Sequence, residues 1–209
     1  MARYDPRDRF FLQAKKDGYR ARSAYKLAEI QKRFRLLRAG DRVLDLGAAP
    51  GGFCQVAAAN VGPKGFVLGV DLEVIPSLPP PVVTWAADAF TPELLARLRS
   101  EGRAPYDVVL SDLAPKTSGV HQSDEARSLA LAERALDLTR QVLRPGGSFA
   151  VKLFMGAGFE EYRALCRDAF GKVKAMKPEA SVARHSKELY LVCQEHKLPT
   201  ARSESPASR

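Results

Sequence analysis

The segment Asp45-Leu46-Gly47-Ala48-Ala49-Pro50-Gly51-Gly52-Phe53 decides the fold class of this chain. It follows a short apolar run, Val43 to Leu46, and precedes a helix predicted at residues 52–61. Glycines between a strand and a helix let the backbone pass close to a ligand at the carboxyl edge of a parallel sheet. The segment therefore predicts an α/β fold with a ligand site after its first strand, although a purely structural turn has the same pattern.

Short β-branched apolar runs alternate with longer amphipathic stretches along the rest of the chain. Strands are predicted at 43–46, 66–72, 82–85, 106–110, 148–154 and 188–193, and helices at about 23–37, 52–61, 92–101, 124–143 and 159–170. This alternation is typical of a mainly parallel sheet with helices on both faces. The fold class is therefore predicted to be α/β.

The positive charge of the chain is concentrated at its N-terminal end. The 209 residues include 33 Lys or Arg and 24 Asp or Glu, a formal net charge of +9. Residues 1–42 hold 13 basic and 5 acidic residues, a net charge of +8, whereas the other residues have a net charge of +1. A segment that faces nucleic acid has this composition, and so does a solvated basic helix.

Other protein classes are disfavoured by the sequence. The cysteines, Cys54, Cys166 and Cys193, lie far apart, with no CxxC pair and no histidine at ligand spacing. We therefore expect neither a metal site nor a disulfide framework. The N-terminus lacks the apolar stretch of a signal peptide, and no run is long enough to span a bilayer. A cytoplasmic protein without a membrane partner is expected.

The glycine turn differs from two common nucleotide-binding motifs. Gly47 and Gly52 have the spacing of a P-loop, but Phe53 and Cys54 occupy the positions of the Lys and Ser or Thr that hold phosphate and magnesium. The dinucleotide pattern G-x-G-x-x-G is absent as well. A loop without a lysine for anions favours a nucleoside over a pyrophosphate.

Acidic residues at successive strand ends indicate which nucleoside the loop binds. Asp71 follows the glycine turn by about twenty residues, where a carboxylate can bind the two hydroxyls of a ribose. Asp88 and Asp112 close the next two strands. We expect Asp88 to accept a hydrogen bond from an adenine amino group and Phe53 to lie beside the ring. S-adenosylmethionine (SAM) is the cofactor that fits this pattern.

Five motifs, in order and at family-like intervals, resemble the FtsJ/RrmJ family of RNA ribose 2′-O-methyltransferases over about residues 17–194. They are Arg22-Ser23-Ala24-Tyr25-Lys26-Leu27, Asp45 to Gly52, Ser111-Asp112-Leu113-Ala114-Pro115, Pro145-Gly146-Gly147-Ser148-Phe149 with Val151-Lys152, and Ser186-Lys187-Glu188-Leu189-Tyr190. The resemblance implies a Rossmann-like SAM-dependent methyltransferase fold, a seven-stranded, mostly parallel sheet whose last strand, containing Leu189 to Cys193, is antiparallel. Phe53 departs from the family, which usually has Trp there.

The resemblance also implies two sets of site residues. The SAM pocket corresponds to Gly51, Phe53, Asp71, Asp88 and Asp112, and the catalytic set to Lys26, Asp112, Lys152 and Glu188. Chemistry favours Lys152 as the base, because a ribose hydroxyl must lose its proton when it attacks a methyl group. A nearby cation such as Lys26 favours the neutral amine, and Asp112 and Glu188 are expected to orient the lysines, SAM or the ribose. A structural salt-bridge network is the alternative, but a lysine in an apolar strand is costly without a purpose.

These inferences predict a basic RNA-docking segment with a helix at 1–42, a SAM-dependent methyltransferase domain at 43–196 and a disordered tail at 197–209. The resemblance implies methylation of a ribose 2′-hydroxyl in RNA, with the A-loop uridine of 23S ribosomal RNA in the large ribosomal subunit as the first choice. A transfer RNA anticodon loop and a catalytically silent SAM- or RNA-binding module are the alternatives. We expect a monomer that does not bind DNA.

Overall fold

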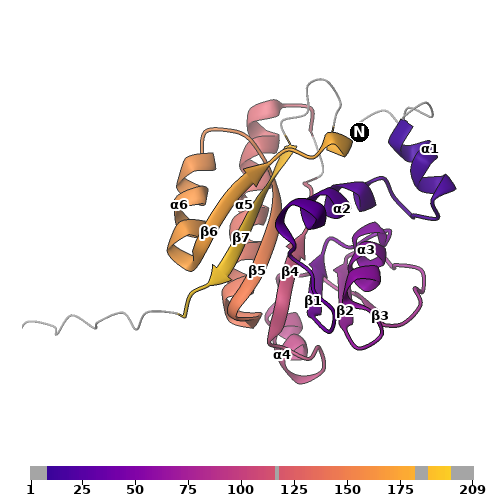
Figure 1. Ribbon diagram of the computed structural model, residues 1–209. Coiled ribbons are helices and arrows are strands. Elements are labelled where there is room, and N and C mark those ends of the chain that lie inside the picture. Colours follow the sequence, from indigo (N-terminus) through magenta and orange to yellow (C-terminus); the bar gives the residue numbers. More distant parts are fainter. Residues whose placement is uncertain (1–8, 116–117, 182–187, 199–209) are drawn as a thin grey trace, which may run out of the picture.

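A seven-stranded sheet forms the centre of the computed structural model, which describes residues 9–115, 118–181 and 188–198 (Figure 1). The strand order is β3-β2-β1-β4-β5-β7-β6. The strands are β1 (Arg42–Leu46), β2 (Phe66–Asp71), β3 (Val82–Ala86), β4 (Tyr106–Ser111), β5 (Leu143–Phe154), β6 (Phe170–Met176) and β7 (Glu188–His196). Neighbours among β1 to β5 pair in parallel, whereas β7 is antiparallel to β5 and β6. The predicted α/β fold and its antiparallel last strand are therefore confirmed.

Helices cover both faces of the sheet (Figure 1). One face packs against α2 (Ser23–Phe34) and α3 (Gly52–Val61), and the other against α4 (Pro92–Ser100), α5 (His121–Val142) and α6 (Phe159–Ala169). A first helix, α1 (Arg9–Lys16), precedes α2, and a short 3₁₀ helix, η1 (Glu179–Ser181), precedes β7. No helix in the described ranges is long and apolar enough to cross a membrane.

Two local predictions are wrong. The strand predicted from Ser148 begins earlier, at Leu143, and its pairing with β4 shifts between Tyr106 and Val108, around Pro145-Gly146-Gly147. Phe170, expected to end a helix, begins β6. β6 is missing from the strands predicted from the sequence. It contains few β-branched or aromatic residues, and Lys172 and Lys174 are exposed, so its sequence has no clear strand pattern.

The helix predicted in the basic N-terminal segment is present as α2 and contributes to the core. Ala24, Leu27 and Ile30 are fully buried against the face that α3 also covers. Most of the tail predicted at 197–209, and Ser186 and Lys187 of the fifth motif, lie outside the described residues.

Candidate active site

Three side chains meet at the carboxyl edge of the parallel strands, where β4 and β5 end and β7 begins. Lys152 of β5 lies directly opposite Tyr190 of β7 in the antiparallel ladder. Its Nζ lies 2.9 Å from Asp112 Oδ1 and donates a hydrogen bond to the Asp112 main-chain oxygen at 2.6 Å. Tyr190 donates its hydroxyl proton to Asp112 Oδ1. The alternation of β5 explains the position, because Phe149, Val151 and Leu153 face α5 while Ala150 and Lys152 face α2.

A second lysine reaches this cluster from α2. Lys26 Nζ lies 2.5 Å from Glu188 Oε1 and 6.0 Å from the centroid of the Tyr190 ring. The Ser181 hydroxyl donates a hydrogen bond to the same Glu188 oxygen at 2.7 Å. Lys26 is only 7% exposed, although it belongs to the basic N-terminal segment. The structure therefore brings Lys26, Asp112, Lys152 and Glu188 together as predicted.

The charges in this cluster depend strongly on one another. Burial alone would raise the pKa of Asp112, but the charges of Lys152 and Lys26, with hydrogen bonds from Tyr190 and Lys152, hold it below its ordinary value. Burial and the neighbouring charges of Asp112 and Glu188 raise the pKa of Tyr190 well above 10. Asp112 is thus an ionised acceptor and Tyr190 a permanent donor.

The glycine turn after β1 requires glycine at two positions. Gly47 has φ +76°, and a Cβ there would lie 2.9 Å from the backbone nitrogen of Leu113. Gly51 has φ +111°, a backbone conformation that residues with a side chain rarely adopt. The first glycine therefore lets the turn approach the chain after Asp112, and the second begins α3.

A cavity of about 430 Å³ opens beside this turn. We call it the carboxylate cavity, because its lining includes three of the predicted carboxylates, Asp71, Asp88 and Asp112. Asp71 Oδ2 also accepts a hydrogen bond from the Ala49 amide at 2.9 Å, which ties the end of β2 to the turn. The predicted convergence of acids at the strand ends is therefore present.

Gly51 and Phe53 are not among the described residues that line this cavity. The Phe53 side chain is 3% exposed and packs against Tyr190, with 6.2 Å between ring centroids. This position gives no support to the expected place of the Phe53 ring beside an adenine. Both residues lie where α3 begins. The Gly51 N–H donates to the Ala48 carbonyl at 2.6 Å, so the backbone N–H groups that this turn can offer a ligand are those of Gly52 and Phe53, which have no partners inside the helix.

A family model described as FtsJ-like methyltransferase matches residues 19–196. The chain belongs to the FtsJ-like methyltransferase family. Among its relatives, a protein of Myxococcus xanthus named ribosomal RNA large subunit methyltransferase E is 48% identical over 95% of this chain and 93% of its own length. A protein of Syntrophobacter fumaroxidans with the same name is 50% identical over 90% of this chain and 95% of its own.

Solved structures share the fold of this FtsJ-like chain. A Plasmodium falciparum protein described as a ribosomal RNA methyltransferase superposes with a TM-score of 0.74 at 24% identity, over 85% of this chain and 98% of its own. A Lactococcus lactis protein described as a hemolysin gives a TM-score of 0.62 at 18% identity, over 88% and 92% of the two chains. At these identities the likeness concerns the fold alone.

The sequence does not single out several residues that shape the site of this FtsJ-like methyltransferase. Tyr190 was visible only as part of a motif, and its bond to Asp112 joins residues 78 positions apart. Asp45 is fully buried, with Cys54 donating to Oδ2 at 3.2 Å and with no hydrogen-bond partner for Oδ1 among the described residues. Arg134 lies over the Phe90 ring at 4.2 Å and lines the carboxylate cavity. None of these contacts has a signal in local sequence.

Proposed function

We propose that this chain transfers a methyl group from SAM to a ribose 2′-hydroxyl in RNA, and that its substrate is the A-loop uridine of 23S ribosomal RNA in the large ribosomal subunit. One observation carries the proposal. Asp112 both lines the carboxylate cavity and binds the Lys152 amine, so a cofactor site and a lysine able to accept a proton share one residue. The names of relatives that are 48% and 50% identical support the choice of ribosomal RNA.

The carboxylate cavity fits SAM on electrostatic grounds. Carboxylates along its wall disfavour a phosphate and favour a nucleoside that carries positive charge, as the sulfonium and ammonium groups of SAM do. Asp71 would hold the ribose hydroxyls, Asp88 the adenine amino group and Asp112 the end nearest Lys152, and the backbone N–H groups of Gly52 and Phe53 would bind the carboxylate of the methionine moiety. In this arrangement Phe53 contributes through its main chain and by supporting Tyr190. When bound, SAM supplies the electrophilic methyl group.

In this proposal Asp112 would hold the neutral form of the Lys152 amine so that its electron pair can accept a proton. A neutral lysine amine has two N–H groups and one lone pair. Nζ lies within hydrogen-bond distance of two Asp112 oxygens, the side-chain Oδ1 at 2.9 Å and the main-chain oxygen at 2.6 Å. If both N–H groups bind these oxygens, the lone pair faces elsewhere and can take the proton of the ribose hydroxyl. A positioned base of this kind contributes typically about 10²–10⁴-fold to the rate.

The other charged groups have positioning roles in this proposal. Asp112 fixes the direction of the Lys152 Nζ through its two oxygens. Lys26 places a second positive charge in the same cluster. Glu188 holds Lys26 and offers an acceptor for a ribose hydroxyl.

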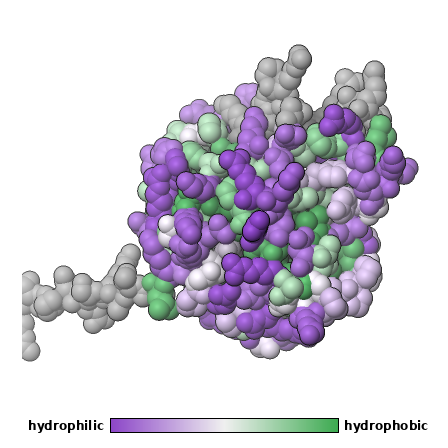
Figure 2. All heavy atoms as spheres, viewed as in Figure 1, coloured by the Kyte–Doolittle hydropathy of each residue, from purple (hydrophilic) through white to green (hydrophobic). Residues whose placement is uncertain are grey.

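The basic segment at 1–42 would dock the RNA. On α2 and just after it, Lys32, Arg33 and Arg35 are exposed, and the face of the molecule around this helix is largely hydrophilic (Figure 2). Exposed cations meet phosphates without reading sequence. A monomer acting in the cytoplasm on ribosomal RNA completes the proposal.

Methylation assays with separate RNA substrates test the proposed function. The protein is incubated with SAM labelled in its methyl group and, separately, with large ribosomal subunits, naked ribosomal RNA and transfer RNA, and the labelled nucleotide is mapped. We expect label on one ribose of 23S ribosomal RNA. Label in transfer RNA alone would mean that transfer RNA, and not ribosomal RNA, is the substrate. No label in any RNA would favour the silent binding module.

A further inference from the structure

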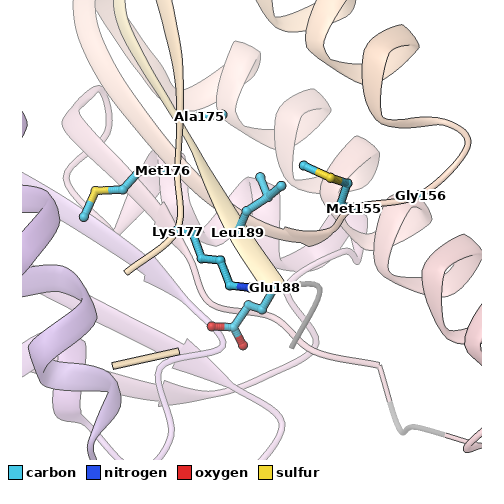
Figure 3. Close-up of a pocket in the computed structure, with 7 residues that line it drawn as sticks. All are labelled: Met155, Gly156, Ala175, Met176, Lys177, Glu188 and Leu189. Carbon is cyan, nitrogen blue, oxygen red and sulfur yellow. The ribbon is translucent and has the colours of Figure 1, made fainter. Parts of the chain in front are cut away.

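A second cavity, of about 660 Å³, has Glu188, the partner of Lys26, in its lining (Figure 3). The ends of β5 and β6 and the start of β7 form it, and we call it the Met155 pocket after the residues Met155, Gly156, Met176, Lys177, Glu188 and Leu189 that line it. In Figure 3, Met155 and Leu189 lie on one side of it, and Lys177 and Glu188 extend toward its end. Its volume falls in the range of about 300–1,000 Å³ that is usual for small-molecule sites.

The position of this pocket relative to the proposed reaction indicates which part of the RNA it would bind. Glu188 lines the Met155 pocket and pairs with Lys26, whereas Asp112 lines the carboxylate cavity and pairs with Lys152. Each cavity is therefore lined by the carboxylate of one of the two lysine–carboxylate pairs. A ribose whose 2′-hydroxyl faces Lys152 carries its base on the adjacent carbon, C1′. With the cofactor beside Asp112, the Met155 pocket beside Glu188 offers space for that base.

The chemistry of the pocket suits a nucleobase. Its walls are largely apolar, and Met155 is 53% exposed although its side chain is hydrophobic. Methionine is flexible and polarisable, and it packs well against flat rings. Lys177 and Glu188 add polar groups to the lining, as the polar edge of a base requires.

We infer that the Met155 pocket binds the unstacked base of the nucleotide whose ribose is methylated, an inference that rests on the proposed function. A base can enter only after it leaves its stack, which costs a few kcal/mol and is easiest in a single-stranded loop. Contact with Met155 and Leu189 offsets part of that cost. The pocket thereby favours unpaired target nucleotides and fixes the ribose beside Lys152.

The test compares Met155→Ala with the native protein on two RNAs that differ at one nucleotide. One is a ribosomal RNA hairpin that contains the mapped target nucleotide, and the other has an abasic ribose at that position. Dissociation constants are measured at one salt concentration in the presence of SAM, so a slowly methylated RNA still gives a result. Leu165→Ala, which truncates an apolar side chain 41% exposed on α6, is the matched control.

We expect Met155→Ala to weaken binding of the intact hairpin by up to about tenfold, the upper end for one contact between a methionine and a ring. On the abasic RNA the variant and the native protein should bind equally, and Leu165→Ala should match the native protein on both RNAs. Met155→Leu should restore most of the affinity for the intact hairpin. Equal losses on the two RNAs, or no loss on the intact hairpin, would overturn the base pocket.

The failure of this inference can be told from failure of the proposed function. If the native protein methylates no RNA in the mapping assay, the proposed function is wrong. If it methylates the hairpin while Met155→Ala behaves alike on intact and abasic RNA, only the base pocket is wrong.

Discussion

Tyr190 and Lys152 both bind Oδ1 of Asp112, although they come from two different strands. The two residues lie opposite each other in the ladder between β5 and β7, and Asp112 follows β4. Their hydrogen bonds leave the carboxylate little freedom to rotate. Because Asp112 in turn fixes the Lys152 amine, the Tyr190 hydroxyl acts on the proposed base through a second residue.

Tyr190→Phe should therefore slow methyl transfer without unfolding the protein. The variant removes one hydrogen bond to a charged group, which is worth about 1.5–3 kcal/mol, so we expect a rate loss of roughly tenfold or more under single-turnover conditions. Tyr106→Phe is the matched control, since that hydroxyl donates to the Gly102 carbonyl away from the site. An equal loss of rate in both variants would mean that the loss comes from lower stability of the protein and not from the bond between Tyr190 and Asp112.

Lys152→Ala should abolish methyl transfer and leave SAM binding nearly unchanged. The rate is expected to fall by about 10²–10⁴-fold, because the proton acceptor is lost. Single-turnover methylation and calorimetric SAM titration measure the two effects, and circular dichroism checks the fold, since Lys152 is a buried partner of Asp112. Lys174→Ala, on the exposed side of β6, should behave as the native protein does. Substantial activity in Lys152→Ala would mean that another group is the base.

The sequence predicts the sheet and the strand-end carboxylates well, because both follow from local patterns. Apolar alternation places Asp71 and Asp112 at strand ends, and parallel strands bring such ends to one edge. The pairing of Lys26 with Glu188 is different, since it joins residues 162 positions apart. The sequence places Lys26 in the basic segment, which has the composition of a solvated helix, and only the packing of α2 on the sheet shows that Lys26 is buried. The motif resemblance named both residues but gave no geometry.

Phe53 shows the same limit from the opposite direction. Its place after the glycine turn predicted a ring beside the cofactor, but the first turn of α3 directs the side chain into the core against Tyr190. A position in a motif does not distinguish a main-chain contribution from a side-chain one. The Met155 pocket likewise has no sequence signal, because three strands distant in sequence form it.

Asp45→Asn should change how stability depends on pH. Burial, with the nearby charges of Asp112 and Asp71, raises the pKa of Asp45 from 3.8 to about 7. Between about pH 4 and 7 the folded protein therefore binds more protons at this site than the unfolded chain, so the site lowers the free energy of unfolding as pH rises through that window. Asparagine has no proton to lose and keeps an acceptor for Cys54.

Urea unfolding at a series of pH values between about 4 and 8 measures this effect. The stability of Asp45→Asn relative to the native protein should increase across the window and level off above it. Asp88→Asn, which changes an exposed carboxylate at a neighbouring strand end, is the control. A constant difference between the native protein and Asp45→Asn at every pH would contradict the buried, protonated Asp45.

Arg20 should affect SAM binding more than its place in the basic segment suggests. Its guanidinium donates to the main-chain oxygens of Pro76, of Ser77 at 2.6 Å and of Pro50 at 3.4 Å. These contacts tie the N-terminal segment to the glycine turn and to the chain after β2, beside the carboxylate cavity. Arg20→Ala frees both loops, so we expect SAM affinity to fall by about 1 kcal/mol, roughly fivefold.

Lys32→Ala is the matched comparison for Arg20→Ala, because Lys32 is an exposed cation on α2. It should weaken RNA binding and reduce the salt dependence of that binding while leaving SAM affinity unchanged. Calorimetry with SAM and RNA binding at several salt concentrations separate the two variants. If Arg20→Ala left SAM affinity intact and weakened only RNA binding, the basic segment would serve RNA alone, and the contacts of Arg20 would have no part in shaping the cofactor site.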